Sequence, residues 1–214
     1  MNILQERAQQ QFPSVLLTLL SIVQALALEL LWGHVQESAY LVKLNWLSVL
    51  AWVQIVTTLF GIVLIWVVYA SAAMRFRWTP STSDSVYPFI IGMLEFSQIA
   101  LLGPERIGQW AILMAIIFGA MVMVSHFIMR RARQNGNNGG FFQNTKPAKL
   151  HDFYPHIAVV LLLTGGGVYA WINASNGGFA LTLILAILGL LMWQYWSAAK
   201  FWKISISEDE PLNR

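Results

Sequence analysis

The 214-residue sequence has no cysteine, few charged residues and no recognisable catalytic motif, and each absence excludes a kind of chemistry. Without cysteine the chain forms no disulfide and offers no thiolate. Only 11% of its residues are charged, against about a quarter in an ordinary soluble domain. The sequence has no GxSxG elbow, HExxH motif or phosphate-binding glycine loop. We therefore expect a protein that is not an enzyme and holds no cofactor or metal.

Apolar residues make up 57% of the chain, and they gather in long blocks. Most of these blocks approach the ~20 residues that a helix needs to cross a hydrocarbon core. Because lipid offers no partner to backbone polar groups, such segments cross a bilayer as helices. The sequence predicts an all-α integral membrane protein: one domain of six transmembrane helices surrounded by the lipid bilayer. The six blocks are residues 13–33, 46–71, 87–103, 109–129, 156–172 and 179–199.

Lysine and arginine residues predict the orientation of the six blocks. If the N-terminus is cytoplasmic, eleven of the 13 Lys and Arg residues fall in cytoplasmic segments, and only Lys43 and Arg106 fall in outer loops. Loops rich in Lys and Arg remain in the cytoplasm, so we expect both termini there. This placement accounts for the pI of about 9.3 without a nucleic-acid partner. The absent cysteines and short outer loops favour a bacterial inner membrane.

The largest segment between blocks, residues 132–153, is rich in Asn and Gly. This composition predicts a mobile loop, which the orientation above places in the cytoplasm. Residues 130–149 are basic, so this region is a candidate binding surface for a cytoplasmic protein partner.

Polar side chains inside the blocks fall at one predicted depth. At ~1.5 Å per residue from the outer end of each block, Gln24, Gln54 and Glu95 lie roughly 12–13 Å deep. Glu95 and Gln98 are three residues apart and therefore share a helix face. The remaining candidates for a path through this layer are Glu29, Thr57, Thr58, Gly165, Gly166 and Gly167.

A carboxylate at this depth is costly and normally faces the interior of a helix bundle or water. Three states of Glu95 are open: protonated, ionised in a wet cavity, or ionised against a cation from outside the chain. In the first state Glu95 bonds Gln54 or Gln24 and only holds helices together. The other two states are those that a proton or cation pathway needs.

Two further features have alternative interpretations. The run TGGGVYA could be unwound so that its carbonyls bind an ion, or its glycines could permit close helix packing. His126 and His156 fall near the inner ends of their blocks, where an imidazole can respond to pH near neutrality. Pairing them as haem or metal ligands is less favoured, because His34 and His151 supply no matching second pair.

We therefore expect a small channel or transporter for protons, cations or a small polar solute, centred on Glu95, with a path between protomers of a homo-oligomer. The alternative is a non-catalytic membrane subunit, sensor or membrane-acting effector. Such a protein would act through self-association and its basic cytoplasmic loop.

Overall fold

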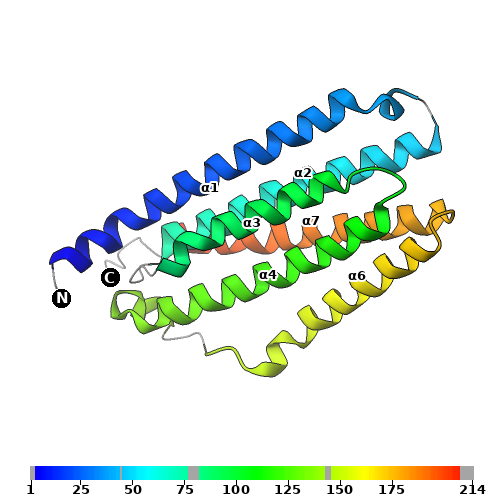
Figure 1. The fold of residues 1–214 in the computed structure, drawn as a ribbon. Helices are drawn as coiled ribbons and strands as arrows, with labels where there is room; N and C mark the ends of the chain where they lie inside the picture. The colour runs from blue at the N-terminus through cyan, green and yellow to red at the C-terminus, as the bar shows by residue number, and fades with distance from the viewer. Residues whose placement is uncertain (1–2, 44, 77–81, 143–145, 208–214) are drawn as a thin grey trace.

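The computed structural model describes residues 3–43, 45–76, 82–142 and 146–207, and it is almost entirely helical (Figure 1). The described part contains no strand, and each of the six apolar blocks corresponds to one long helix. The all-α prediction is therefore confirmed. The long helices are α1 (Ile3–Glu37), α2 (Trp46–Arg75), α3 (Thr82–Ala100), α4 (Ile107–Gln134), α6 (Tyr154–Ile172) and α7 (Gly177–Ser207).

Five of the long helices, all except α3, are long and apolar enough to cross a membrane. Helix α3 has 19 residues and carries Asp84, Glu95 and Gln98, which lower its apolar character. Large apolar side chains cover the outside of the bundle: Leu161 is 66% and Leu162 is 74% exposed. Such a surface fits contact with lipid tails, and the five helices indicate an integral membrane protein.

Successive long helices run in opposite directions, so their connections gather at two ends (Figure 1). We call the end with the described connecting residues 38–43, 101–106 and 173–176 the short-turn end. It includes the short helix η1 (Ala39–Val42), and Asn45 caps α2 there by accepting a hydrogen bond from Ser48 N at 2.9 Å. The opposite end, with the start of α1 and the described residues 135–142 and 146–153, is the long-loop end.

Within residues 135–142 and 146–153, the parts of this connection that the structure describes, lie three short helical turns: η2 (Gly136–Asn138), α5 (Gly139–Phe142) and η3 (Leu150–Phe153). The α5 turn contacts the ends of the long helices. The Arg75 guanidinium lies 4.4 Å from the centre of the Phe141 ring, and that of Arg133 lies 4.5 Å from the centre of Phe142. The segment predicted as a loop thus carries helical turns and packs in part against the bundle.

The helices pack mainly in neighbouring pairs: α1 against α3 and α2, α2 against α7, and α4 against α6. Glycine allows the closest of these approaches. A Cβ atom at Gly108 of α4 would lie 2.5 Å from the backbone nitrogen of Trp171 in α6. A Cβ atom at Gly167 of α6 would lie 2.7 Å from Ile112 Cγ1 of α4. The α4–α6 pair is therefore tightest near the short-turn end, where these residues lie.

The apolar core is largest in the short-turn half of the bundle, where it surrounds Trp110, Ile184 and Ile187. A smaller cluster around Tyr69 and Ile128 lies towards the long-loop end. A cavity runs between the helices from the middle of the bundle towards the long-loop end.

Candidate functional site: a closed-ended cavity at Glu95

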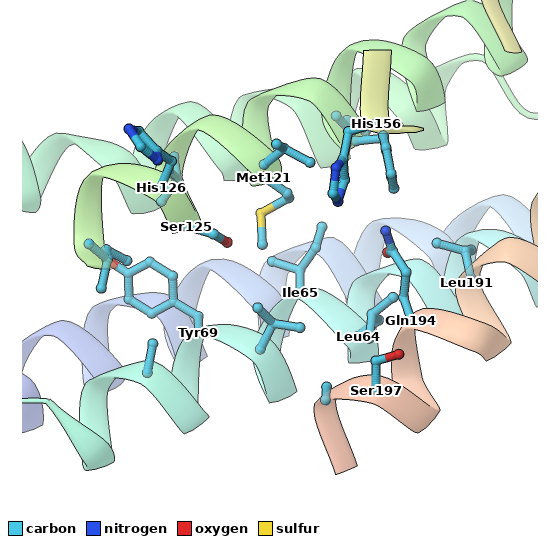
Figure 2. A pocket seen from close by; sticks show the side chains of 18 of the residues that line it. Leu64, Ile65, Tyr69, Met121, Ser125, His126, His156, Leu191, Gln194 and Ser197 are labelled. Carbon is cyan, nitrogen blue, oxygen red and sulfur yellow. The ribbon is translucent and has the colours of Figure 1, made fainter. Parts of the chain in front are cut away.

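The cavity has a volume of about 910 Å³, and its walls come mainly from α2, α4 and α7, with α3 and α6 contributing fewer residues. Along α2 and its C-cap residue the lining extends from Thr58 to Phe76, which is about 27 Å of helix. Figure 2 shows Met121 of α4 and His156 of α6 pointing across the cavity towards the face that carries Ile65 and Gln194. Most of its lining area is apolar.

The cavity ends in the middle of the bundle, beside Glu95 and Gln98 of α3 and Thr58 of α2. Glu95 is the one acidic residue among the described lining residues, and both Glu95 and Gln98 are 2% exposed. Glu95 and Gln98, which the sequence places on one helix face, thus both line the same cavity. The basic residues of the lining, Arg130, Arg133 and Lys146, lie towards the long-loop end.

Helix α1 holds one oxygen of Glu95. Gln24 Nε2 donates a hydrogen bond to Glu95 Oε1 at 2.6 Å, and both side chains are buried. Glu95 Oε2 has no hydrogen-bond partner among the described residues. Gly92, one turn earlier in α3, permits this approach, because a Cβ atom there would lie 2.4 Å from Val23 Cγ1 of α1. Glu95 is therefore fixed on one side and free to bind on the other.

Trp110 fills the bundle on the short-turn side of Gln98. Its side chain is fully buried, and its indole nitrogen donates to Thr58 Oγ1 at 3.0 Å. Gln98 Nε2 donates to the Trp110 carbonyl at 3.1 Å, which leaves Gln98 Oε1 without a partner in the described chain. The indole thus lies where a path from the cavity to the short-turn end would pass.

The other predicted polar residues of α2 turn elsewhere. Gln54 Oε1 accepts a hydrogen bond from Gly103 N at 3.0 Å and so ties α2 to the turn after α3. Thr57 donates to the carbonyl of Val53 in its own helix at 2.7 Å. Gln54 and Thr57 are buried but do not line the cavity. Among the predicted partners of Glu95, Gln24 bonds it and Gln54 does not.

The glycine run lies outside the cavity lining, within a continuous α6. Gly165 faces open space, Gly166 approaches Leu183 of α7, and Gly167 packs against α4. These contacts favour the packing interpretation of the run. Glu29 is an exposed residue of α1 and does not line the cavity.

Both predicted histidines line the cavity at its long-loop side. The His156 ring stacks on Phe118 with ring centres 6.1 Å apart, and the His126 ring meets Phe153 edge-on at 5.1 Å. The described residues contain no group of three or more His, Cys, Asp or Glu side chains that could hold a metal ion.

Sequence reasoning missed two elements of the site. Gly92 is one of 15 glycines in the sequence, but its spacing of three from Glu95 places it on the same helix face. Trp110 lies near the end of its apolar block, a position typical of an interfacial tryptophan, yet it is fully buried. No family model, curated protein or solved structure matches the chain.

Proposed function

We propose that the chain is a membrane carrier that binds a proton or a cation at Glu95. The observation that supports this most directly is Glu95 Oε2, a buried oxygen without a described partner at the closed end of a large cavity. A buried polar group that is left unpaired is costly and calls for a function. A binding role at Glu95 accounts for that cost, whereas a purely structural Glu–Gln pair would not need the cavity.

A carrier fits the cavity better than an open channel does. The cavity lining stops at Thr58 of α2 and Met114 of α4, and the fully buried Trp110 follows on the short-turn side. Carriers expose one site to the two sides of a membrane alternately. A cavity that reaches its binding group without opening at the short-turn end corresponds to one of those two states.

The topology that we propose has six spans, with the long-loop end in the cytoplasm. Helix α3 is then a span in addition to the five long apolar helices. It packs against α1, which shields its polar residues. Eleven of the 13 Lys and Arg residues lie on the cytoplasmic side in this arrangement, as the positive-inside rule for membrane proteins requires. The cavity would then open to the cytoplasm, and a bacterial inner membrane remains the predicted location.

The direct test is flux through purified protein in liposomes, followed with a pH-sensitive dye under a potassium gradient. We expect flux with the wild type and its loss in Glu95→Gln, because the amide keeps the shape but cannot carry a proton or a negative charge. Glu105→Gln, in the exposed turn after α3, is the matched control and should behave as the wild type does. Equal flux in wild type and Glu95→Gln would disprove the role of Glu95.

Absence of flux in the wild type, across several ions and both pH directions, would favour the second class of function. The protein would then act as a subunit, sensor or effector through self-association or through residues 130–149.

A further inference from the structure

We infer that the molecule carried is an amphipathic organic cation, with its charge at Glu95 and its apolar body along the cavity. The inference rests on the proposed carrier function and adds the class of substrate. It follows from the chemistry of the closed end, from that of the walls, and from the route by which the cavity reaches the surface.

The closed end presents hydrogen-bond acceptors. Glu95 Oε2 and Gln98 Oε1 are both buried without a described partner, one turn apart on the same face. Gln98 Nε2 is already used by the Trp110 carbonyl, and Glu95 Oε1 by Gln24. A ligand that donates hydrogen bonds or carries positive charge satisfies both free oxygens, whereas an anion would be repelled by Glu95.

The walls favour an organic cation over a metal ion. Hard metal cations require six or more oxygen ligands around them. The lining near Glu95 supplies few oxygens and is otherwise apolar, with residues such as Ile62, Met114 and Leu163. The volume of about 910 Å³ lies within the range of sites that hold organic ligands. Phe118 and Trp193 add aromatic rings, whose faces attract cations.

The cavity also reaches the flank of the bundle. Trp193 of α7 lines the cavity and is nevertheless 66% exposed. Helix α6 packs mainly against α4 and helix α7 mainly against α2, and α6 and α7 contact each other far less than either contacts its main partner. A cation with an apolar body concentrates in the bilayer and can enter beside Trp193. It thereby avoids the basic residues Arg130 and Lys146 at the long-loop end of the cavity.

Protons should compete with such a substrate, because a protonated Glu95 has lost the charge that binds it. The other titratable or charged side chains in the described lining are Tyr69, His126, Arg130, Arg133, Lys146 and His156. Protonation of the two histidines would also oppose a cation. The part of the pH dependence that belongs to Glu95 is the part that disappears in Glu95→Gln.

The test is equilibrium binding of radiolabelled tetraphenylphosphonium to the purified full chain in phosphatidylcholine nanodiscs, with binding to empty nanodiscs subtracted. Unlabelled competitors test separately whether the positive charge and the apolar body of the ligand are each required for binding. Triphenylphosphine oxide has the apolar body without the charge, and tetramethylammonium has the charge without the body. We expect saturable binding that neither competitor displaces at concentrations where unlabelled tetraphenylphosphonium does.

We expect Glu95→Gln to weaken binding by about tenfold or more, since it leaves a buried cation without its counter-charge. Glu95→Asp should retain part of the affinity, and Glu105→Gln all of it. Gel filtration and helical circular dichroism confirm that each variant is folded, and the Asp variant keeps the test valid if the Gln variant does not fold. Lowering the pH should weaken binding to the wild type more than binding to Glu95→Gln.

Two binding results would overturn the inference that Glu95 binds an organic cation: no saturable binding to folded wild type, or equal binding by wild type and Glu95→Gln. Proton flux in liposomes separates this failure from that of the proposed function. Glu95-dependent proton flux without tetraphenylphosphonium binding refutes only the substrate class. Glu95-dependent binding without any flux refutes carriage, and with it the inference that the cation is carried.

Discussion

Trp110 Nε1 donates a hydrogen bond to Thr58 Oγ1 at 3.0 Å, which joins α4 to α2 beside the closed end of the cavity. The Thr58 hydroxyl in turn donates to the Gln54 carbonyl at 2.9 Å. The indole is fully buried, and its own carbonyl accepts from Gln98. One residue therefore fixes three helices where the cavity ends.

Truncating this residue should open the bundle. We expect Trp110→Ala to make liposomes leak protons and potassium without added substrate, because it removes the largest buried side chain of the short-turn half. It should also cost about 3–5 kcal/mol of stability, as large core truncations do. Trp110→Phe retains most of the ring and should leak less. Dye-based efflux and thermal unfolding measure the two effects, and a Trp110→Ala protein as tight as the wild type would contradict the role of the indole as a plug.

The Gln24–Glu95 bond should depend on the absence of a side chain at Gly92. A Cβ atom at that position would lie 2.4 Å from Val23 Cγ1. Gly92→Ala should therefore push α1 from α3 and cost about 1–3 kcal/mol, as overpacking does. Val23→Ala removes the clashing atom, so the double variant should recover part of that loss.

Gly61→Ala is the matched control for this pair, since a Cβ atom there meets its neighbours at an ordinary 3.8 Å. Thermal unfolding followed by circular dichroism compares all four variants. If Gly92→Ala and Gly61→Ala prove equally stable, α1 and α3 do not approach as closely as described.

The glycine run of α6 contains its own control. Gly167→Ala should destabilise the protein by about 1–3 kcal/mol, because a Cβ atom would meet Ile112 Cγ1 at 2.7 Å and the Gly108 carbonyl oxygen at 2.9 Å. Gly165 faces open space, so Gly165→Ala should be neutral or gain up to about 1 kcal/mol from helix propensity. Unfolding midpoints test this order. Loss of flux in Gly165→Ala with stability unchanged would instead favour an ion-binding role for the run.

The absence of cysteine allows the proposed topology to be tested with single introduced cysteines. We expect Glu105→Cys to react with a membrane-impermeant maleimide in intact cells, and Lys146→Cys to react only after permeabilisation. Both native side chains are exposed, so access to each cysteine depends on the side of the membrane. Labelling of Lys146→Cys in intact cells would contradict the proposed orientation, in which the long-loop end lies in the cytoplasm.

Helix positions could be predicted from the sequence because apolar length determines them almost independently of the partner helices. The ends of the helices are harder to predict from the sequence. Helix α4 continues to Gln134, whereas its apolar block ends at residue 129, and helix α3 ends at Ala100, whereas its block ends at residue 103. Polar residues at the membrane surface can extend a helix beyond its apolar block, and polar residues that begin a turn can end the helix early. Neither effect changes the number of apolar residues in the block.

Side-chain partners depend on how helices rotate and tilt against one another, and sequence depth alone does not define this. Gln24 and Gln54 had the same predicted depth as Glu95, yet only Gln24 bonds it. Gln54 bonds the turn at Gly103 instead. The close approach at Gly92 brings α1 rather than α2 against Glu95, and a single sequence contains no signal for that choice.

The glycine contacts between Gly108 and Gly167 also have a mechanical consequence. They allow α4 and α6 to pack closely near the short-turn end, while α2 packs against α7. In the carrier that we propose, we expect each of these two helix pairs to move as one unit. The hydrogen bonds that join Trp110 of α4 to α2 and α3 would then have to break before the short-turn end could open.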